Sequence, residues 1–133
     1  MISTDSLGKL VLRLTIGGLL LLHGVHKLLD GIEPIKQMVA AHGVPDALAY
    51  GVYLGEVVGP ILVILGLFSR IGALLIVADM IVAVVAARLG DLFALTPVGG
   101  YALELEACFL FGAAAIVLLG AGRLSLGGSG RWN

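Results

Sequence analysis

The residues of this chain that are best suited to acid–base chemistry lie within long apolar stretches. His23, His26 and Lys27 follow the spacing i, i+3 and i+4, so on a helix their side chains share one face. Glu56 and Asp79 fall near the middle of the next two apolar stretches. Imidazole, ammonium and carboxyl groups can hold a proton, donate it or stabilise a developing charge. The pattern therefore predicts a buried polar pocket that binds a ligand and transfers protons.

Two further acids lie in the last apolar stretch. On a helix, Glu104 shares a face with Cys108 and Phe111, whereas Glu106 points elsewhere. A single unpaired charge at the centre of a bilayer costs at least about 2.5–3.5 kcal/mol. These groups must therefore be paired, protonated or turned toward a polar cavity.

The ionisable groups allow two interpretations. In the first, they form a structural network in which the cations Lys27 and Arg13 offset Glu56, Asp79 and Glu104. In the second, they line a functional pocket. We favour the pocket, because the number of acids and the two histidines exceed what packing helices together requires.

Four apolar stretches must position these residues. Each is close to the ~20 residues with which a helix crosses the ~30 Å hydrocarbon layer of a membrane. Of the 133 residues, 59% are hydrophobic and only 13% are charged, against about 25% in soluble domains, and the mean hydropathy is +1.11. We therefore predict an all-α fold, an integral membrane four-helix bundle with antiparallel helices, as a single transmembrane domain over residues 1–133. The expected spans cover approximately residues 7–29, 47–67, 71–89 and 99–119.

The connections between the spans carry their own signals. Residues 66–70, Gly-Leu-Phe-Ser-Arg, are so few that spans two and three must form an antiparallel hairpin. Glu33-Pro34 opens a short helix that Gly43 ends. We expect this amphipathic helix to lie in the membrane interface and to cover the outer end of the bundle. The glycine-rich residues 126–130 predict a flexible tail. The apolar face of the short helix would consist of Ile35, Met38, Val39 and His42.

The cations are distributed unevenly between the two ends of the predicted bundle. By the positive-inside rule, this bias predicts a multi-pass protein of the inner or plasma membrane with both termini on the cytoplasmic side. The terminal end holds Lys9, Arg13, Arg70, Arg123 and Arg131, and the other end holds Lys27, Lys36 and Arg88.

Small residues in the second span predict close helix packing. Gly51, Gly55 and Gly59 follow one another at intervals of four, which lets a second backbone approach their shared face. Packing within the bundle accounts for this ridge, and a homo-oligomer is the alternative.

Several other chemistries are not expected, and we predict no haem and no metal. His23 and His26 are the only pair with a metal-like spacing, no Glu-x-x-His motif of the di-iron kind is present, and His42 lies in a connection. The single cysteine, Cys108, excludes an internal disulfide and a Cys-x-x-Cys redox motif. A net charge of -1 gives no indication of a nucleic-acid partner.

A series of short motifs, in order along nearly the whole chain, resembles the DoxX family. The resemblance implies a four-helix membrane protein that joins soluble enzymes in a redox complex, and the family takes its name from a small subunit of a thiosulfate:quinone oxidoreductase. One departure is Gly127, where relatives often have Asp after Ser-Leu. The motifs are His23-Gly24-x-x-Lys27, Gly55-Glu56-x-x-Gly59, residues 66–70, Met80, Glu106 and residues 120–126. Carried over by position, they point to His23, Lys27, Glu56, Arg70 and Glu106.

The residues and the resemblance together predict a quinone-associated membrane subunit of an oxidoreductase, which receives its electrons from a protein partner. A histidine would donate a hydrogen bond to a quinone oxygen, Lys27 would stabilise the developing negative charge, and the glutamates would relay protons. Two alternatives remain open: a non-catalytic membrane anchor or assembly subunit, and a small transporter or lipid-handling protein. The predicted catalytic residues are His23, Lys27, Glu56 and Glu106. The predicted cofactor-binding residues are His26, Tyr53, Asp79, Glu104 and Arg70.

Overall fold

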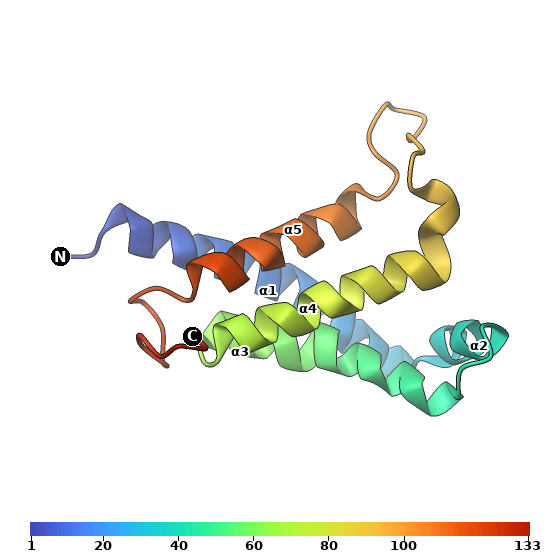
Figure 1. Cartoon of the computed structure of the whole chain (residues 1–133), viewed down its shortest axis with the longest axis horizontal. Coiled ribbons are helices and arrows are strands. Elements are labelled where there is room, and N and C mark those ends of the chain that lie inside the picture. Colours follow the sequence, from blue (N-terminus) through green and yellow to red (C-terminus); the bar gives the residue numbers. More distant parts are fainter.

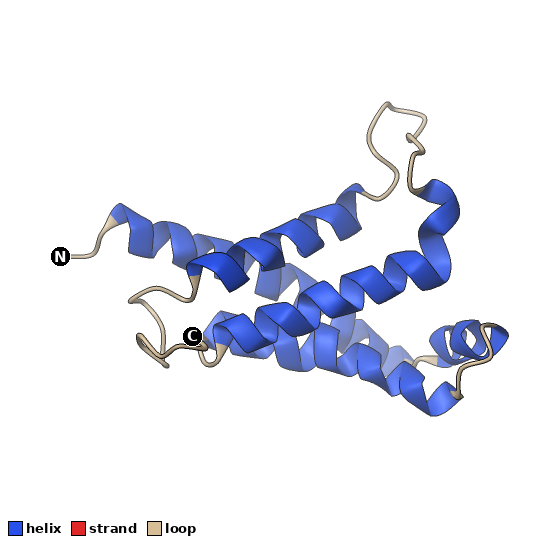
Figure 2. Ribbon diagram, in the orientation of Figure 1, coloured by secondary structure: helices blue, strands red, loops and turns tan.

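The computed structural model describes the whole chain, Met1–Asn133, and its regular secondary structure is all helical, with no strand (Figures 1 and 2). The α-helices are α1 (Thr4–Asp30), α2 (Glu33–Ala41), α3 (Gly59–Leu65), α4 (Ser69–Ala83) and α5 (Glu104–Leu119). Before α3 lie a 3₁₀ turn, Asp46–Gly51, and a π-helical turn, Leu54–Val58. After α4 lie a π-helical turn, Val84–Arg88, and a 3₁₀ turn, Leu89–Asp91.

Three helical segments are long and apolar enough to cross a membrane, namely Thr4–Asp30, Asp46–Leu65 and Ser69–Asp91. The all-α class is thereby confirmed. The fourth expected span corresponds to α5, which has 16 residues and begins at Glu104 rather than at residue 99. At ~1.5 Å per residue α5 is about 24 Å long, less than the ~30 Å hydrocarbon layer. Four spans in an antiparallel bundle therefore stay a prediction.

The late start of α5 has a local cause in the preceding loop. Leu95 and Tyr101 form an isolated β-bridge, and the N–H of Thr96 donates to the carbonyl of Gly100 over 2.7 Å. This tight turn uses residues that would otherwise begin the helix.

One hydrophobic core joins the three long segments and α5. Apolar side chains also cover the outside of the helices, where Val11, Val82 and Leu118 are 63%, 60% and 80% exposed. In water such a surface would be unfavourable, but in lipid it costs nothing. The core residues are Ile16 and Leu20 of α1, Val63 of α3, Ala73, Ile76 and Met80 of α4, and Phe109, Ala113 and Ile116 of α5.

Arg13 is the most deeply buried charged side chain, with 1% of its surface exposed. Its guanidinium donates to the carbonyls of Val63 and Ile64 at 2.9 and 3.0 Å and to those of Ala121 and Leu124 at 2.8 Å each. It therefore satisfies carbonyls at the C-terminal end of α3 and in the segment after α5. The expectation that Arg13 offsets the intramembrane acids is wrong, since its bonds go to backbone oxygens.

The C-terminal segment folds back over the hairpin between α3 and α4, so the prediction of a flexible tail is wrong. Gly66 ends α3 with φ +72°, and the N–H groups of Leu126 and Gly127 donate to the carbonyls of Leu65 and Gly66. The side-chain oxygen of Asn133 accepts from the N–H of Ser69 at 3.1 Å and so caps α4. These backbone bonds fix the tail because its glycines let two chain segments approach closely.

The two ends of the molecule are formed by different parts of the chain. Both termini lie at one end, and α2 lies at the other (Figure 1). We call these the terminal end and the α2 end. As predicted, α2 begins with Glu33-Pro34 and stops just before Gly43, whose φ is +73°.

Candidate functional site

An ion pair at the α2 end joins the last turn of α1 to the π-helical turn Leu54–Val58. The Nζ of Lys27 lies 2.5 Å from Oε2 of Glu56. The Glu56 side chain is only 7% exposed and that of Lys27 is 26% exposed. A buried carboxylate needs such a partner, and the pair ties the two helices together.

Glycines bring the helices close enough for these side chains to meet. A Cβ atom on Gly24 would overlap the backbone carbonyl of Glu56, and one on Gly55 would overlap the side chain of Asp79. A Cβ on Gly59 would come within 2.8 Å of the carbonyl oxygen of Gly72, whereas one on Gly51 would have nothing within 4 Å. The predicted ridge therefore allows close helix packing at Gly55 and Gly59, and the helices that pack there belong to one chain.

Asp79 adds a second acid to the pair. It lines the same cavity as Glu56 and Lys27, and its Oδ2 is buried with no hydrogen-bond partner. With Lys27 charged, the three groups are neutral only when one of the two acids holds a proton. We call Lys27, Glu56 and Asp79 the polar trio.

The polar trio lines a cavity of about 470 Å³. Most of the wall is apolar, and α2 contributes Ile35, Met38 and Val39, as the predicted face requires. The fourth member of that face, His42, is exposed and contacts the carbonyl of Met38. The cavity therefore combines an apolar lining with a few convergent polar groups, which is typical of a ligand site.

A second polar group lies at the edge of the same cavity. Arg88, in the π-helical turn after α4, pairs with Glu106 of α5 at 3.0 Å and with Asp91 at 2.8 Å. It also donates to the carbonyl of Ala102 at 3.1 Å. Arg88 thus holds α5 and its preceding loop against α4, and it brings Glu106 to the cavity.

The short helix α2 is held over this region by its contact with the segment that begins the second long helix. The Nζ of Lys36 lies 4.7 Å above the ring centre of Tyr50. The side chain of Tyr50, followed by the carboxylate of Glu33, raises the pKa of Lys36 above its usual range. Lys36 itself does not line the cavity.

Of the residues predicted from the sequence, the structure gathers Lys27, Glu56, Asp79 and Glu106 around the cavity. Tyr53 lies beside them and donates from its hydroxyl to the carbonyl of Lys27 at 3.2 Å. Tyr53 thereby caps the end of α1.

The remaining predicted residues lie elsewhere. His23 is exposed, with its ring edge-on to Phe109 at 5.7 Å, and His26 pairs with Asp30 at 3.1 Å on the surface. Glu104 is exposed in the first turn of α5, so Glu106 and not Glu104 faces the cavity.

Arg70 lies at the terminal end, far along the molecule from the polar trio, and lines a different cavity.

Sequence reasoning missed the role of Arg88 and the two π-helical turns. Each π turn carries a charged residue of the cavity wall, Glu56 in one and Arg88 in the other. Such turns are frequent at functional sites. The i, i+3 spacing of Arg88 and Asp91 could have predicted their ion pair. No periodicity in the sequence predicts a π-helical turn.

The three long apolar helices define a helical membrane protein, and the polar trio lies in the wall of a largely apolar cavity beneath α2. The model of the DoxX family matches residues 8–89, and the chain belongs to this family. The match includes the polar trio and Arg88 but ends before α5.

One curated relative supports this assignment. The chain is 32% identical over 83 residues to a Bacillus subtilis (strain 168) protein named "Putative oxidoreductase CatD". The alignment covers 62% of this chain and 61% of the relative, so less than two thirds of the relative's length is matched. No solved structure matches the chain.

Proposed function

We propose that this DoxX-family protein is the membrane subunit of a redox complex and that it binds a quinone in the cavity beneath α2. The observation that carries the proposal is the polar trio, a cation and two acids opening into a largely apolar cavity of about 470 Å³. The name of the Bacillus relative supports an oxidoreductase setting.

The cavity fits the chemistry of a quinone. Its volume lies within the roughly 300–1,000 Å³ of typical ligand sites. The apolar walls from α2 and α4 suit the ring and its hydrocarbon chain. Lys27 and Arg88 are the hydrogen-bond donors that could reach a carbonyl oxygen.

The polar trio has a definite role in this proposal. A quinone supplies the capacity to take up two electrons and two protons. The ammonium of Lys27 donates a hydrogen bond to a carbonyl oxygen and stabilises the negative charge that grows there. Glu56 and Asp79 would pass on the one proton that they share, and Glu106, paired with Arg88 at the cavity edge, would relay the second proton from the α2 end. The electrons come from a partner oxidoreductase.

A binding experiment with decylubiquinone tests the proposal. We expect wild-type protein in phosphatidylcholine nanodiscs to bind it saturably, and Lys27→Met to weaken binding about tenfold or more, because a charge-assisted hydrogen bond is lost. The matched control is Lys9→Met, which removes a lysine that pairs with Asp5 at the terminal end and does not line this cavity. Equal binding by all three proteins would contradict the proposal and favour the anchor or the lipid-handling protein.

A matched pair of acid variants sharpens the result. Glu56→Gln should weaken binding, whereas Glu104→Gln should not, because only Glu56 lines the cavity. Weakening by both variants to the same degree would show a general charge effect.

We also propose that α5 completes a four-span antiparallel bundle with both termini in the cytoplasm of a plasma-membrane protein. Both termini lie at one end of the molecule, which supports an even number of crossings (Figure 1). In a Cys108→Ser background, Lys36→Cys should react only with an impermeant maleimide added outside the cell, and Ser129→Cys only from inside. Reaction of both from one side would rule out the even number of spans.

A further inference from the structure

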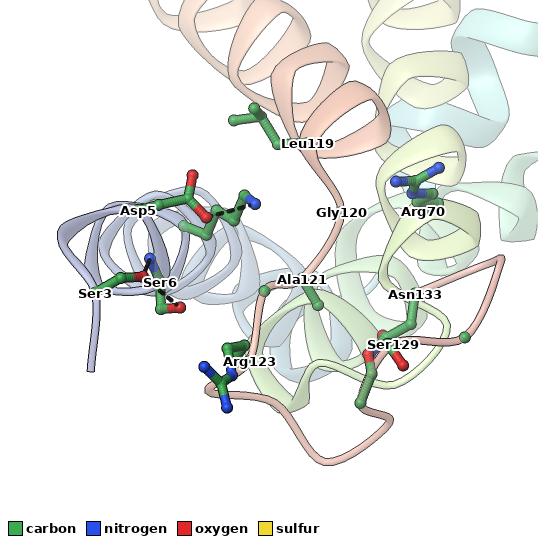
Figure 3. Close-up of a pocket in the computed structure, with 14 residues that line it drawn as sticks. Ser3, Asp5, Ser6, Arg70, Leu119, Gly120, Ala121, Arg123, Ser129 and Asn133 are labelled. Carbon is green, nitrogen blue, oxygen red and sulfur yellow. Dashed lines mark hydrogen bonds and ion pairs between the residues drawn. The ribbon is translucent and has the colours of Figure 1, made fainter. Parts of the chain in front are cut away.

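The terminal end contains a second cavity, of about 530 Å³, that has no part in the proposed quinone chemistry. The start of α1, the segment that leaves α5, Arg70 of α4 and the C-terminal segment enclose it (Figure 3). Its lining is mostly polar. Three cations, Lys9, Arg70 and Arg123, line it against one acid, Asp5.

Arg70 is the unusual member of this lining. Its side chain makes no ion pair, and its Nε is buried without any hydrogen-bond partner. The guanidinium lies against Gly120, where an added Cβ would come within 3.0 Å of it. A buried donor without an acceptor is unfavourable, so an acceptor from outside the chain would stabilise this arrangement.

The other charges of this end are accounted for within the chain. Arg13 donates to four backbone carbonyls, and the guanidinium of Arg131 lies 5.6 Å from the ring centre of Trp132. Lys9 pairs with Asp5 at 2.8 Å, and Asp5 is 67% exposed. Arg70 and Arg123 are left as the two cationic side chains of the cavity that pair with no acidic side chain, although the main-chain oxygen of Asn133 lies beside Arg70 at Gly120. The balance of side-chain charge in the cavity is positive.

The C-terminal segment of the wall offers further donors. The backbone N–H groups of Gly128, Ser129 and Gly130 donate no hydrogen bond within the chain, and these three residues line the cavity. Consecutive free N–H groups in a glycine-rich segment are suited to phosphate oxygens. Asn133, which closes the cavity in Figure 3, anchors this segment to Ser125 and Gly128.

We propose that the cavity of the terminal end binds a phosphate group, with Arg70 as its principal ligand and Arg123 as the second cation. Guanidinium binds phosphate through two parallel hydrogen bonds, which would satisfy the buried Nε of Arg70. The cavity lies where α1 and α4 begin, at the end of long apolar helices. Two sources of the group fit this position: the headgroup of an anionic phospholipid and a free phosphate.

Two probes distinguish the sources. Inorganic phosphate is titrated against the purified protein in neutral detergent while its thermal stability is recorded. In parallel, the lipids retained by the protein from nanodiscs of phosphatidylglycerol and phosphatidylcholine are counted by native mass spectrometry. Stabilisation by phosphate identifies a free phosphate site. Selective retention of phosphatidylglycerol without that stabilisation identifies a lipid site.

Arg70→Gln should weaken whichever interaction is found by about tenfold or more, because it removes the charge and the two parallel donors. Arg123→Gln should weaken it less. Arg131→Gln is the control, because it removes the same charge from the same end but not from the cavity. Circular dichroism confirms that each variant is folded, and Arg123→Gln carries the test if Arg70→Gln is not.

The proposal would be overturned if wild-type protein binds neither probe. It would equally be overturned if Arg131→Gln loses as much binding as the cavity variants, since the effect would then be one of net charge. Decylubiquinone binding in the cavity beneath α2 should be the same in Arg70→Gln and wild type, so the two proposals fail independently.

Discussion

Helix α1 carries two largely buried cations, Arg13 in its first half and Lys27 in its last turn, and they are held in opposite ways. Arg13 is 1% exposed and donates to four backbone carbonyls, so every acceptor around it is fixed and cannot titrate. Lys27 is 26% exposed and faces two carboxyl groups and a cavity. A buried cation that donates to backbone carbonyls stabilises the fold. A cation that faces carboxyl groups beside a cavity is suited to proton exchange. The acceptors, and not the residue type, separate the two roles.

We expect the largest loss of stability from replacing Arg13. Arg13→Met leaves four carbonyls without donors, and we expect it to lower the free energy of unfolding by about 3 kcal/mol or more. Lys27→Met should cost less, because the acids it leaves behind can take up a proton. The measurement is the stability of each variant against sodium dodecyl sulfate in mixed micelles. A smaller loss for Arg13→Met than for Lys27→Met would reverse the comparison.

The glycine ridge offers the next test. Gly55→Leu places a side chain where Asp79 lies, and we expect it to destabilise the protein by about 1–3 kcal/mol. Gly51→Leu introduces the same side chain where nothing lies within 4 Å and should be nearly neutral. The comparison uses the same micelle assay. If Gly55→Leu were also neutral, the close approach of α4 to this segment would be wrong.

The smallest effect is the coupling within the polar trio. In a double-mutant cycle, Lys27→Met and Glu56→Gln should be non-additive by about 1 kcal/mol, and the double variant should recover part of the stability that either single change removes. Additive losses would show that the two side chains do not act as a pair.

The sequence was sufficient for the parts of the fold that depend on local pattern. Apolar length predicted the three long helices, and Glu33-Pro34 and Gly43 predicted both ends of α2. The hairpin at residues 66–70 followed from the shortness of the connection. The end of the chain could not be predicted in this way. Its glycines indicate flexibility, but Asn133 and the carbonyls of Leu65 and Gly66 hold it in place through long-range bonds.

The site could be predicted only in part, for a related reason. Lys27, Glu56 and Asp79 were identified as ionisable groups that lipid cannot tolerate alone. Which groups meet depends on helix rotation. One π-helical turn carries Glu56 and another follows Asp79, and α5 begins later than its apolar run suggests. The sequence-based prediction therefore included Glu104 and the two histidines, which do not line the cavity, and missed Arg88, which does.

The most direct test of the central claim is to find where a quinone lies on the protein. A photoreactive azidoquinone is irradiated with the protein in nanodiscs, and the labelled peptides are identified by mass spectrometry. We expect adducts on α2 and α4 residues of the cavity wall, such as Met38 and Leu75, and their loss when excess decylubiquinone is added. Adducts spread over exposed residues such as Val11 and Leu118, with no competition, would contradict the account, because the cavity beneath α2 would then bind no quinone.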